Sequence, residues 1–151
     1  MLPSASIALG LAVFLLSGCT EAVKPTRSDL VGEWSTRHGA SLSFKADGTF
    51  QAVGLPPSYF LSSIMDDVNR FGGHGIWSLE PLDESVRDYR PWEITLNFQE
   101  LTPNVPEQVK SFSTQVYLAG SSPLGSPPWQ VVSWEHGDMD GGDMLVFSRT
   151  P

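Results

Sequence analysis

The chain has 151 residues, enough for one domain and too few for two of ordinary size. Its 17 acidic and 9 basic residues give a net charge of −8 at pH 7, and the basic residues are scattered singly. Nucleic acids attract clusters of Lys and Arg, so this charge balance argues against a nucleic-acid partner and leaves a basic protein allowed.

Residues 1–18 have the features of an export signal. They contain no charged side chain, and the apolar run 7–16 is as long as the hydrophobic segment of a signal peptide. The run is shorter than the roughly 20 residues that a membrane-spanning helix needs. Small residues follow it directly, as cleavage requires. We therefore predict that residues 1–18 are a signal peptide.

The residues Leu16-Ser17-Gly18-Cys19 resemble the lipobox of bacterial lipoproteins. The resemblance implies cleavage before Cys19, acylation of its sulfur, and anchoring of the protein to a membrane of the bacterial cell envelope. One acyl chain anchors only marginally, so the multiply acylated cysteine of that family meets the need for at least two. The alternative is a buried free cysteine in an N-terminal core helix, since unpaired Cys packs as a small hydrophobe.

Residues 19–29 are predicted to form a flexible tether. They are mostly polar, include Pro25 and show no apolar period. Ten extended residues reach about 33 Å, enough to lift a small domain clear of the headgroups. The folded domain is then expected over residues 30–151.

The domain is predicted to be all-β, an antiparallel meander of about eight strands forming a small barrel. Short β-like runs alternate with turn residues, and no long helix is present to make a parallel crossover. Eight strands suffice to close a barrel and remove its edges. The candidate strands are residues 30–37, two strands of a hairpin within 41–53, 76–82, 92–98, 111–119, 129–135 and 144–149.

The hairpin over residues 41–53 is predicted to turn through a three-residue loop, Ala46-Asp47-Gly48. This loop pairs Phe44 with Phe50 on one face and places a glycine at the left-handed position. A two-residue loop would mix the two faces, which is strongly disfavoured when one face is buried.

One short helix is expected between the third and fourth strands, after Pro56-Pro57. Ser58 can cap it, and Gly72 and Gly73 can end it. Its apolar stripe would be Leu61, Ile64, Met65, Val68 and Phe71. Such a helix can plug one end of the barrel or act as a lid over it, and we favour the plug.

The last two strands are expected to share one apolar face, with Val132 and Trp134 matched to Leu145 and Phe147. The loop between them, 136–143, carries three Asp residues and invites a calcium site. The spacing does not fit an EF-hand, and Asp and Gly are favoured in turns. We therefore expect an ordinary hairpin loop there.

The sequences "LVGEW", "SLSFKADGTF" and "HGIWSL" together resemble the opening of small lipocalin-like domains, many of which are bacterial lipoproteins. The resemblance covers residues 30–79 and implies a lipocalin-like (calycin-type) barrel. It also implies that Trp34 packs across the closed end of the barrel beneath a basic residue. Arg149 is the candidate for that residue, through a cation–π contact.

No catalytic, metal or cofactor site is predicted. His38, His74 and His136 lie in separate loops without metal-site spacing, and no serine stands in an activating motif. Trp92 and Trp129 each follow a proline and are candidates for a partly exposed ligand or interface surface.

The sequence thus predicts a membrane-anchored binding domain rather than an enzyme. The first hypothesis is a small apolar ligand held inside the barrel, as the lipocalin resemblance implies. The alternative is a protein-interaction module, for instance a hydrolase inhibitor, that uses its acidic surface to capture a basic envelope protein.

Overall fold

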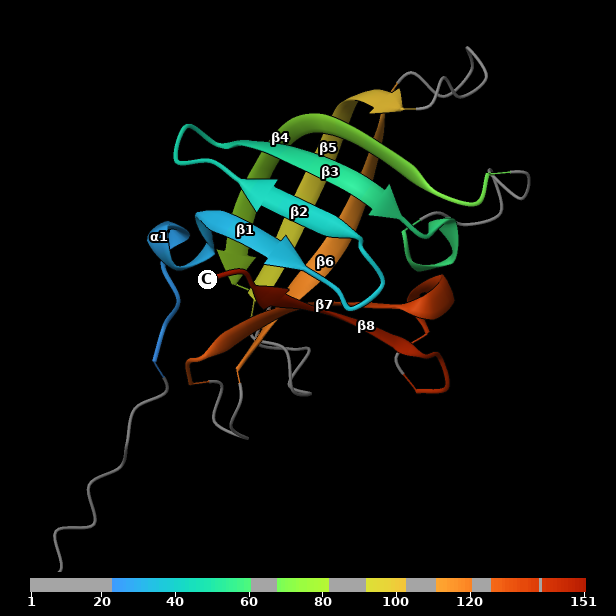
Figure 1. Cartoon of the computed structure of the whole chain (residues 1–151). Helices are drawn as coiled ribbons and strands as arrows, with labels where there is room; N and C mark the ends of the chain where they lie inside the picture. Colours follow the sequence, from blue (N-terminus) through green and yellow to red (C-terminus); the bar gives the residue numbers. More distant parts are fainter. Residues whose placement is uncertain (1–22, 61–67, 82–91, 103–110, 121–125, 139) are drawn as a thin grey trace, which may run out of the picture.

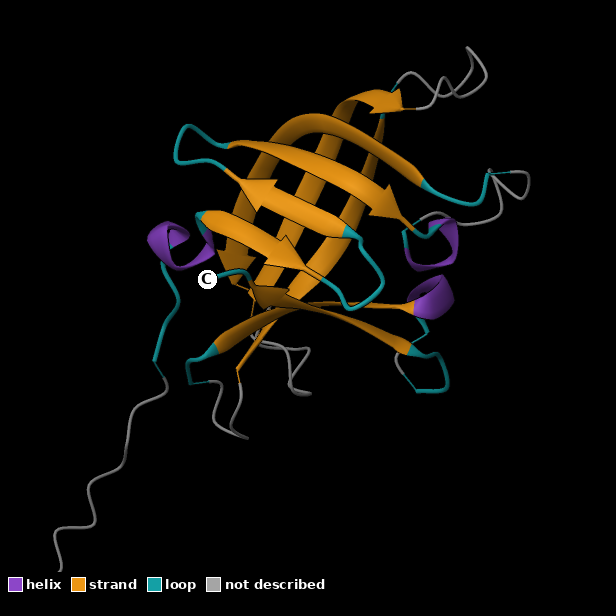
Figure 2. Cartoon of the chain, viewed as in Figure 1, coloured by secondary structure: helices purple, strands orange, loops and turns teal. Residues whose placement is uncertain are grey.

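The computed structural model describes residues 23–60, 68–81, 92–102, 111–120, 126–138 and 140–151. Eight antiparallel strands form a closed barrel in which each strand pairs with the next and β8 returns to β1 (Figures 1 and 2). The strands are β1 (Gly32–Ser35), β2 (Ser41–Phe44), β3 (Thr49–Leu55), β4 (Phe71–Pro81), β5 (Trp92–Thr102), β6 (Phe112–Gly120), β7 (Trp129–Trp134) and β8 (Met144–Arg149). The predicted fold class is confirmed.

Three short helical segments accompany the barrel in the described part of the chain. They are the α-helix α1 (Arg27–Leu30) and the 3-10 helices η1 (Pro57–Tyr59) and η2 (Glu135–Gly137). None of these helices is long and apolar enough to cross a lipid bilayer.

The β2–β3 hairpin turns as predicted. Phe44 pairs with Phe50, and the Lys45 N–H donates to the Thr49 carbonyl at 2.9 Å. Gly48 adopts φ 88°, the left-handed conformation that the loop requires. The Asp47 carboxylate accepts hydrogen bonds from both the N–H (2.9 Å) and the hydroxyl (2.7 Å) of Thr49. The loop therefore fixes the register of the whole hairpin.

The expected face of the β7–β8 hairpin is wrong by one residue. Phe147 pairs with Val131 and Leu145 pairs with Ser133, so Val132 and Trp134 lie on the opposite, outer face. Ser133 is only 2% exposed, and its hydroxyl donates to the carbonyl of Tyr59 at 2.7 Å. Because Ser133 is polar, the apolar residues of β7 do not alternate regularly, and the sequence pattern indicated the wrong face.

The segment between β3 and β4 begins with η1 and Phe60, and residues 61–67 of the predicted helix lie outside the described residues. The expected end of that helix is wrong, because Phe71, Gly72 and Gly73 belong to β4. Phe71 pairs with Leu55 of β3 and points inward, where a strand buries it as well as a helix would.

Aromatic rings fill the interior of the barrel. Phe98 stacks on Phe112 with ring centroids 4.6 Å apart and meets Phe50 edge-on at 4.9 Å. Phe60, which follows η1, reaches in to contact both Phe71 (6.0 Å) and Phe147 (6.4 Å). Such offset and edge-to-face contacts add to the hydrophobic stabilisation that burial itself provides.

Both ends of the barrel are covered (Figure 1). At one end Leu30 of α1 is fully buried, and its carbonyl accepts the indole N–H of Trp34 at 2.8 Å. At the other end the hydroxyl of Thr114 donates to the Phe60 carbonyl at 2.9 Å, and Ser133 donates to Tyr59. These two inward-facing hydroxyls hold η1 and Phe60 across the end as a plug.

The folded region begins before Leu30. Pro25 is buried, and the Asp29 carboxylate accepts the backbone N–H (2.7 Å) and hydroxyl (2.8 Å) of Thr26. Arg27 lies over the ring of Trp77 at 4.5 Å. The last residues of the segment predicted as a tether are therefore packed against the barrel.

Candidate functional site

The structure brings Trp34 and Arg149 together where β1 meets β8. The guanidinium carbon lies 5.4 Å from the centroid of the indole ring, and the two residues are cross-strand partners. Arg149 also donates to the carbonyl of Val31. Gly32, at φ 136°, leaves room for this side chain, since a Cβ there would lie 3.2 Å from a guanidinium nitrogen. Arg149 thus contacts Trp34 and Val31 across the seam between β1 and β8.

The two tryptophans expected at a contact surface lie in different surroundings. Trp129 is 9% exposed and belongs to the hydrophobic core, because it begins β7 on the inner face. The expectation that it is partly exposed is therefore wrong. Trp92 is half-buried at the start of β5 and packs against the core. Neither residue forms an exposed aromatic patch.

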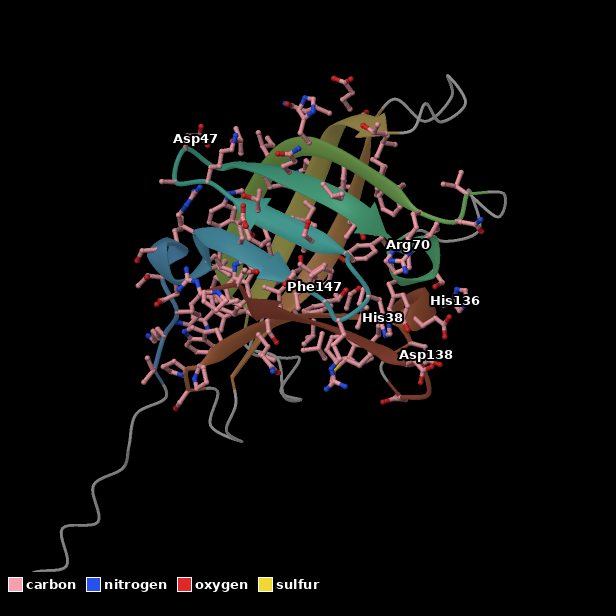
Figure 3. All side chains as sticks on the ribbon, in the orientation of Figure 1. His38, Asp47, Arg70, His136, Asp138 and Phe147 are labelled. Carbon is pink, nitrogen blue, oxygen red and sulfur yellow. The ribbon has the colours of Figure 1, made fainter. Side chains whose placement is uncertain are left out.

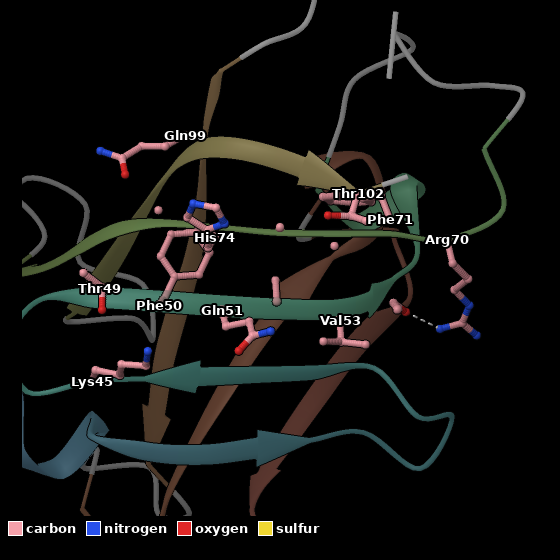
Figure 4. Close-up of a pocket in the computed structure, with 15 residues that line it drawn as sticks. Lys45, Thr49, Phe50, Gln51, Val53, Arg70, Phe71, His74, Gln99 and Thr102 are labelled. Atoms are coloured by element: carbon pink, nitrogen blue, oxygen red, sulfur yellow. Dashed lines mark hydrogen bonds between the residues drawn. The ribbon is translucent and has the colours of Figure 1, made fainter. Parts of the chain in front are cut away.

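The histidines and the acidic loop do not converge on a metal site in the described residues. His38 and His136 lie at the end of the barrel that carries η1, whereas His74 lies on the outer face of β4 (Figures 3 and 4). Asp138 accepts the backbone N–H groups of Asp140 (3.0 Å) and Gly141 (3.2 Å). Its carboxylate therefore shapes the turn, as expected for a hairpin loop.

The plug carries one perturbed titratable group, Tyr59. Burial raises the pKa of its phenol above the usual 10.0, and the carboxylates of Glu135 and Asp143 raise it further. Both effects disfavour the phenolate. The hydroxyl is consequently neutral over the physiological range.

The described residues also form a depression on the outer wall of the barrel, which we call the outer groove (Figure 4). Its volume is about 780 Å³, within the range of roughly 300–1,000 Å³ that is common for ligand pockets. It lies over β3, β4 and β5, outside the sheet rather than within the barrel. Its lining residues are Lys45, Thr49, Phe50, Gln51, Ala52, Val53, Gly54, Arg70, Phe71, Gly72, Gly73, His74, Gly75, Gln99 and Thr102.

Glycines of β4 form the floor of the outer groove. A Cβ added at Gly72, Gly73 or Gly75 would collide with a backbone carbonyl of a neighbouring strand. Gly73 also adopts φ 153°, where a side chain would be strained. The absence of side chains therefore lets β4 lie unusually close to β3 and β5.

Two β-bulges border this floor. On β3, Val53 and Gly54 both stand opposite Gly72, since Ala52 pairs with Gly73 and Leu55 with Phe71. On β5, Gln99 is the extra residue, because the partners of His74 and Gly75 are Glu100 and Phe98. Bulges redirect side chains and are over-represented near functional sites. All three bulged residues line the outer groove.

The outer groove carries positive charge. Lys45 and Arg70 lie toward its opposite ends, and Arg70 is held by a 2.7 Å hydrogen bond to the Gly54 carbonyl (Figure 4). None of the described residues that line it is acidic, although the chain has 17 acidic residues. His74 lies on the same wall, with its Nε2 3.7 Å from a carboxylate oxygen of Glu100 just outside the lining.

Sequence reasoning did not find this groove, because Gly72 and Gly73 were interpreted as the end of a helix. The informative signal was the alternation Phe71, Gly73, Gly75, Trp77, which continues the period of the strand backward through the glycines. Comparisons of the chain with family models, with curated proteins and with solved structures found no match.

Proposed function

We propose that the chain is a lipid-anchored, non-catalytic binding protein of the bacterial cell envelope, with a lipocalin-like barrel that recognises its ligand on its outer surface. The observation that carries the proposal is the filled interior. Rings from β3, β4, β5, β6 and the plug contact one another inside the barrel. The outer groove, in contrast, lies outside the sheet.

The filled interior weighs against an apolar ligand inside the barrel, the first hypothesis from the sequence. Phe50, Phe98 and Phe147 are each no more than 1% exposed. A ligand would have to displace such rings, and removing one Phe from a core costs roughly 3–5 kcal/mol. The plug would also have to leave, which breaks the hydrogen bonds of Thr114 and Ser133.

The anchor is supported by the pattern of residues 1–19. Cys19 is the only cysteine, so its use for acylation leaves no thiol for chemistry elsewhere. We assign the domain no reaction, since no motif in the sequence activates a serine nucleophile.

Two measurements test the proposal. Metabolic labelling with a fatty acid is expected to mark the native chain and to leave Cys19→Ala unmarked, and labelling of the variant would disprove the anchor. Native mass spectrometry of the protein purified from its host is expected to show no apolar molecule retained inside the barrel. A stoichiometric apolar ligand that survives desolvation would contradict recognition on the outer surface.

A further inference from the structure

We propose that the outer groove is a binding site for a small anionic ligand that carries two or more phosphate or carboxylate groups. This inference rests on the proposed function, because it takes the outer wall as the surface of recognition. It adds the location of the site and the chemistry of the ligand.

The charge of the groove is the first argument. The chain as a whole carries −8, so its average surface repels anions. The outer groove has the opposite sign of charge, because Lys45 and Arg70 line it and no described lining residue is acidic. The groove is therefore a place on the described surface where an anion is favoured.

The hydrogen-bonding groups are the second argument. The amides of Gln51 and Gln99 and the hydroxyl of Thr102 lie on exposed residues of the lining. Each can donate to an oxygen of a phosphate or a carboxylate. Arg70 uses one guanidinium nitrogen on Gly54, which fixes the side chain at the rim. A guanidinium fork has further donors that suit these planar or tetrahedral anions.

The construction of the groove is the third argument. The bulge at Val53 and Gly54 and the bulge at Gln99 lie on opposite sides of β4. The glycines between them permit a backbone approach that any side chain would prevent. Bulges and glycines are the ordinary means by which the strands of a barrel bend. Together they lower the floor, and the polar side chains of β3 and β5 are left standing around it.

The test is isothermal titration calorimetry on the full acylated chain in micelles of a neutral detergent, with pyrophosphate and citrate as probes. Saturable binding is expected with a Kd below about 1 mM, a free energy near −4 kcal/mol. Glycerol, which is neutral, is expected to give no saturable heat. A stronger response to pyrophosphate or to citrate will distinguish a phosphate ligand from a carboxylate ligand.

Variants connect the binding to the groove. Arg70→Gln is expected to weaken pyrophosphate or citrate binding about 3- to 10-fold, the range between exposed ion pairs and charge-assisted hydrogen bonds. Lys45→Gln, at the opposite end of the groove, is expected to weaken binding less. Gln51→Glu should abolish it, because it places a carboxylate in the lining. Arg37→Gln is the matched control, since Arg37 is an exposed cation outside the groove. It should change the Kd less than about 2-fold.

Either of two results would overturn the inference: no saturable binding of either probe, or equal weakening by Arg37→Gln and Arg70→Gln. Neither result would touch the proposed function, which depends on the fatty-acid labelling and on the absence of a ligand inside the filled barrel. Conversely, an apolar ligand found inside the barrel would refute recognition on the outer surface whatever the calorimetry shows. The two failures can therefore be told apart.

Discussion

Arg149 lies over the indole of Trp34, with the guanidinium carbon 5.4 Å from the ring centroid, across the seam where the last strand meets the first. The seam is short: the pairs Trp34–Arg149 and Ser35–Ser148 form its register, and the Thr150 N–H adds a hydrogen bond to the Glu33 carbonyl at 2.8 Å. The side chains at the seam therefore matter more to closure than they would between longer strands.

Arg149→Gln is expected to destabilise the protein by about 1–2 kcal/mol. It removes a cation–π contact of roughly 0.5–1 kcal/mol and a hydrogen bond to the Val31 carbonyl of similar worth. Urea unfolding followed by tryptophan fluorescence measures the change. Arg149→Lys should recover part of the loss, and Arg37→Gln should be neutral. A neutral Arg149→Gln would show that the seam does not need this side chain.

Gly75→Ala is expected to cost about 3 kcal/mol or more, because its Cβ would collide with the Asn97 carbonyl of β5. Gly39→Ala is the control. Gly39 has a positive φ, 82°, which Gly75 does not have, but nothing lies within 4 Å of its Cβ, so only backbone strain of about 1–2 kcal/mol applies. Thermal unfolding monitored by circular dichroism compares them. Equal losses of stability in the two variants would show that Gly75 is not required for the close approach of β4 and β5.

Ser133→Ala is expected to lower stability by about 1–2 kcal/mol, because it leaves the Tyr59 carbonyl without its donor. Thr114→Val should have a similar effect through the Phe60 carbonyl. The local readout is amide hydrogen exchange, which should become faster in residues 58–60 and stay unchanged in β5. Ser113→Ala, at an exposed position of β6, should change neither quantity. If amide exchange is unaltered in both Ser133→Ala and Thr114→Val, these two hydroxyls do not hold the plug in place.

Asp47 makes the stability of the β2–β3 hairpin depend on pH at the acid end. Hydrogen bonds from the hydroxyl and N–H of Thr49 lower the pKa of Asp47 below its usual 3.8. The folded state therefore favours the carboxylate, so this contribution is present above pH 3.8 and is lost as the pH falls through the lower folded pKa. Asp47→Asn should reduce the acid-side decline of the urea midpoint. An identical decline in this variant would contradict the assignment.

Tyr59 makes the stability depend on pH at the alkaline end, where its contribution is lost as the pH rises. Its raised pKa means that the folded state favours the neutral phenol, so its contribution is complete below pH 10 and is lost as the pH rises through the folded value. Tyr59→Phe should remove this part of the alkaline decline in stability. Absorbance titration near 295 nm follows the phenolate directly, and a Tyr59 that ionises at the ordinary pH would refute the effect.

Sequence reasoning predicted the strands and the β2–β3 loop because both depend on local signals. The Asp47-Gly48 turn admits one register that keeps Phe44 and Phe50 on one face, and the structure has that register. Closure between β1 and β8 joins residues more than 100 positions apart, and it was predicted from the number of strands, since eight suffice to close a barrel. The pairing of Trp34 with Arg149 at this seam was expected only from the family resemblance.

The errors share a physical cause. Residue type was taken as a guide to local structure, whereas the partner that decides the structure lies elsewhere in the chain. Ser133 is polar but faces inward, because a carbonyl of the plug pairs with it. Gly72 and Gly73 ended a helix in the prediction, yet they serve a strand that must approach its neighbours closely. Such partners come from distant segments, and no local pattern contains them.

The docking of α1 sets how far an acylated protein can stand from its bilayer. Pro25 is buried, so a lipid on Cys19, as proposed, would be joined to the folded region through the residues between Cys19 and Pro25. Fully extended, this stretch spans about 20 Å, well short of the 33 Å that the tether was expected to reach. A barrel anchored in this way would lie close to the headgroups with its α1 end toward the membrane. A solute would then reach the outer groove over β3, β4 and β5 from the side.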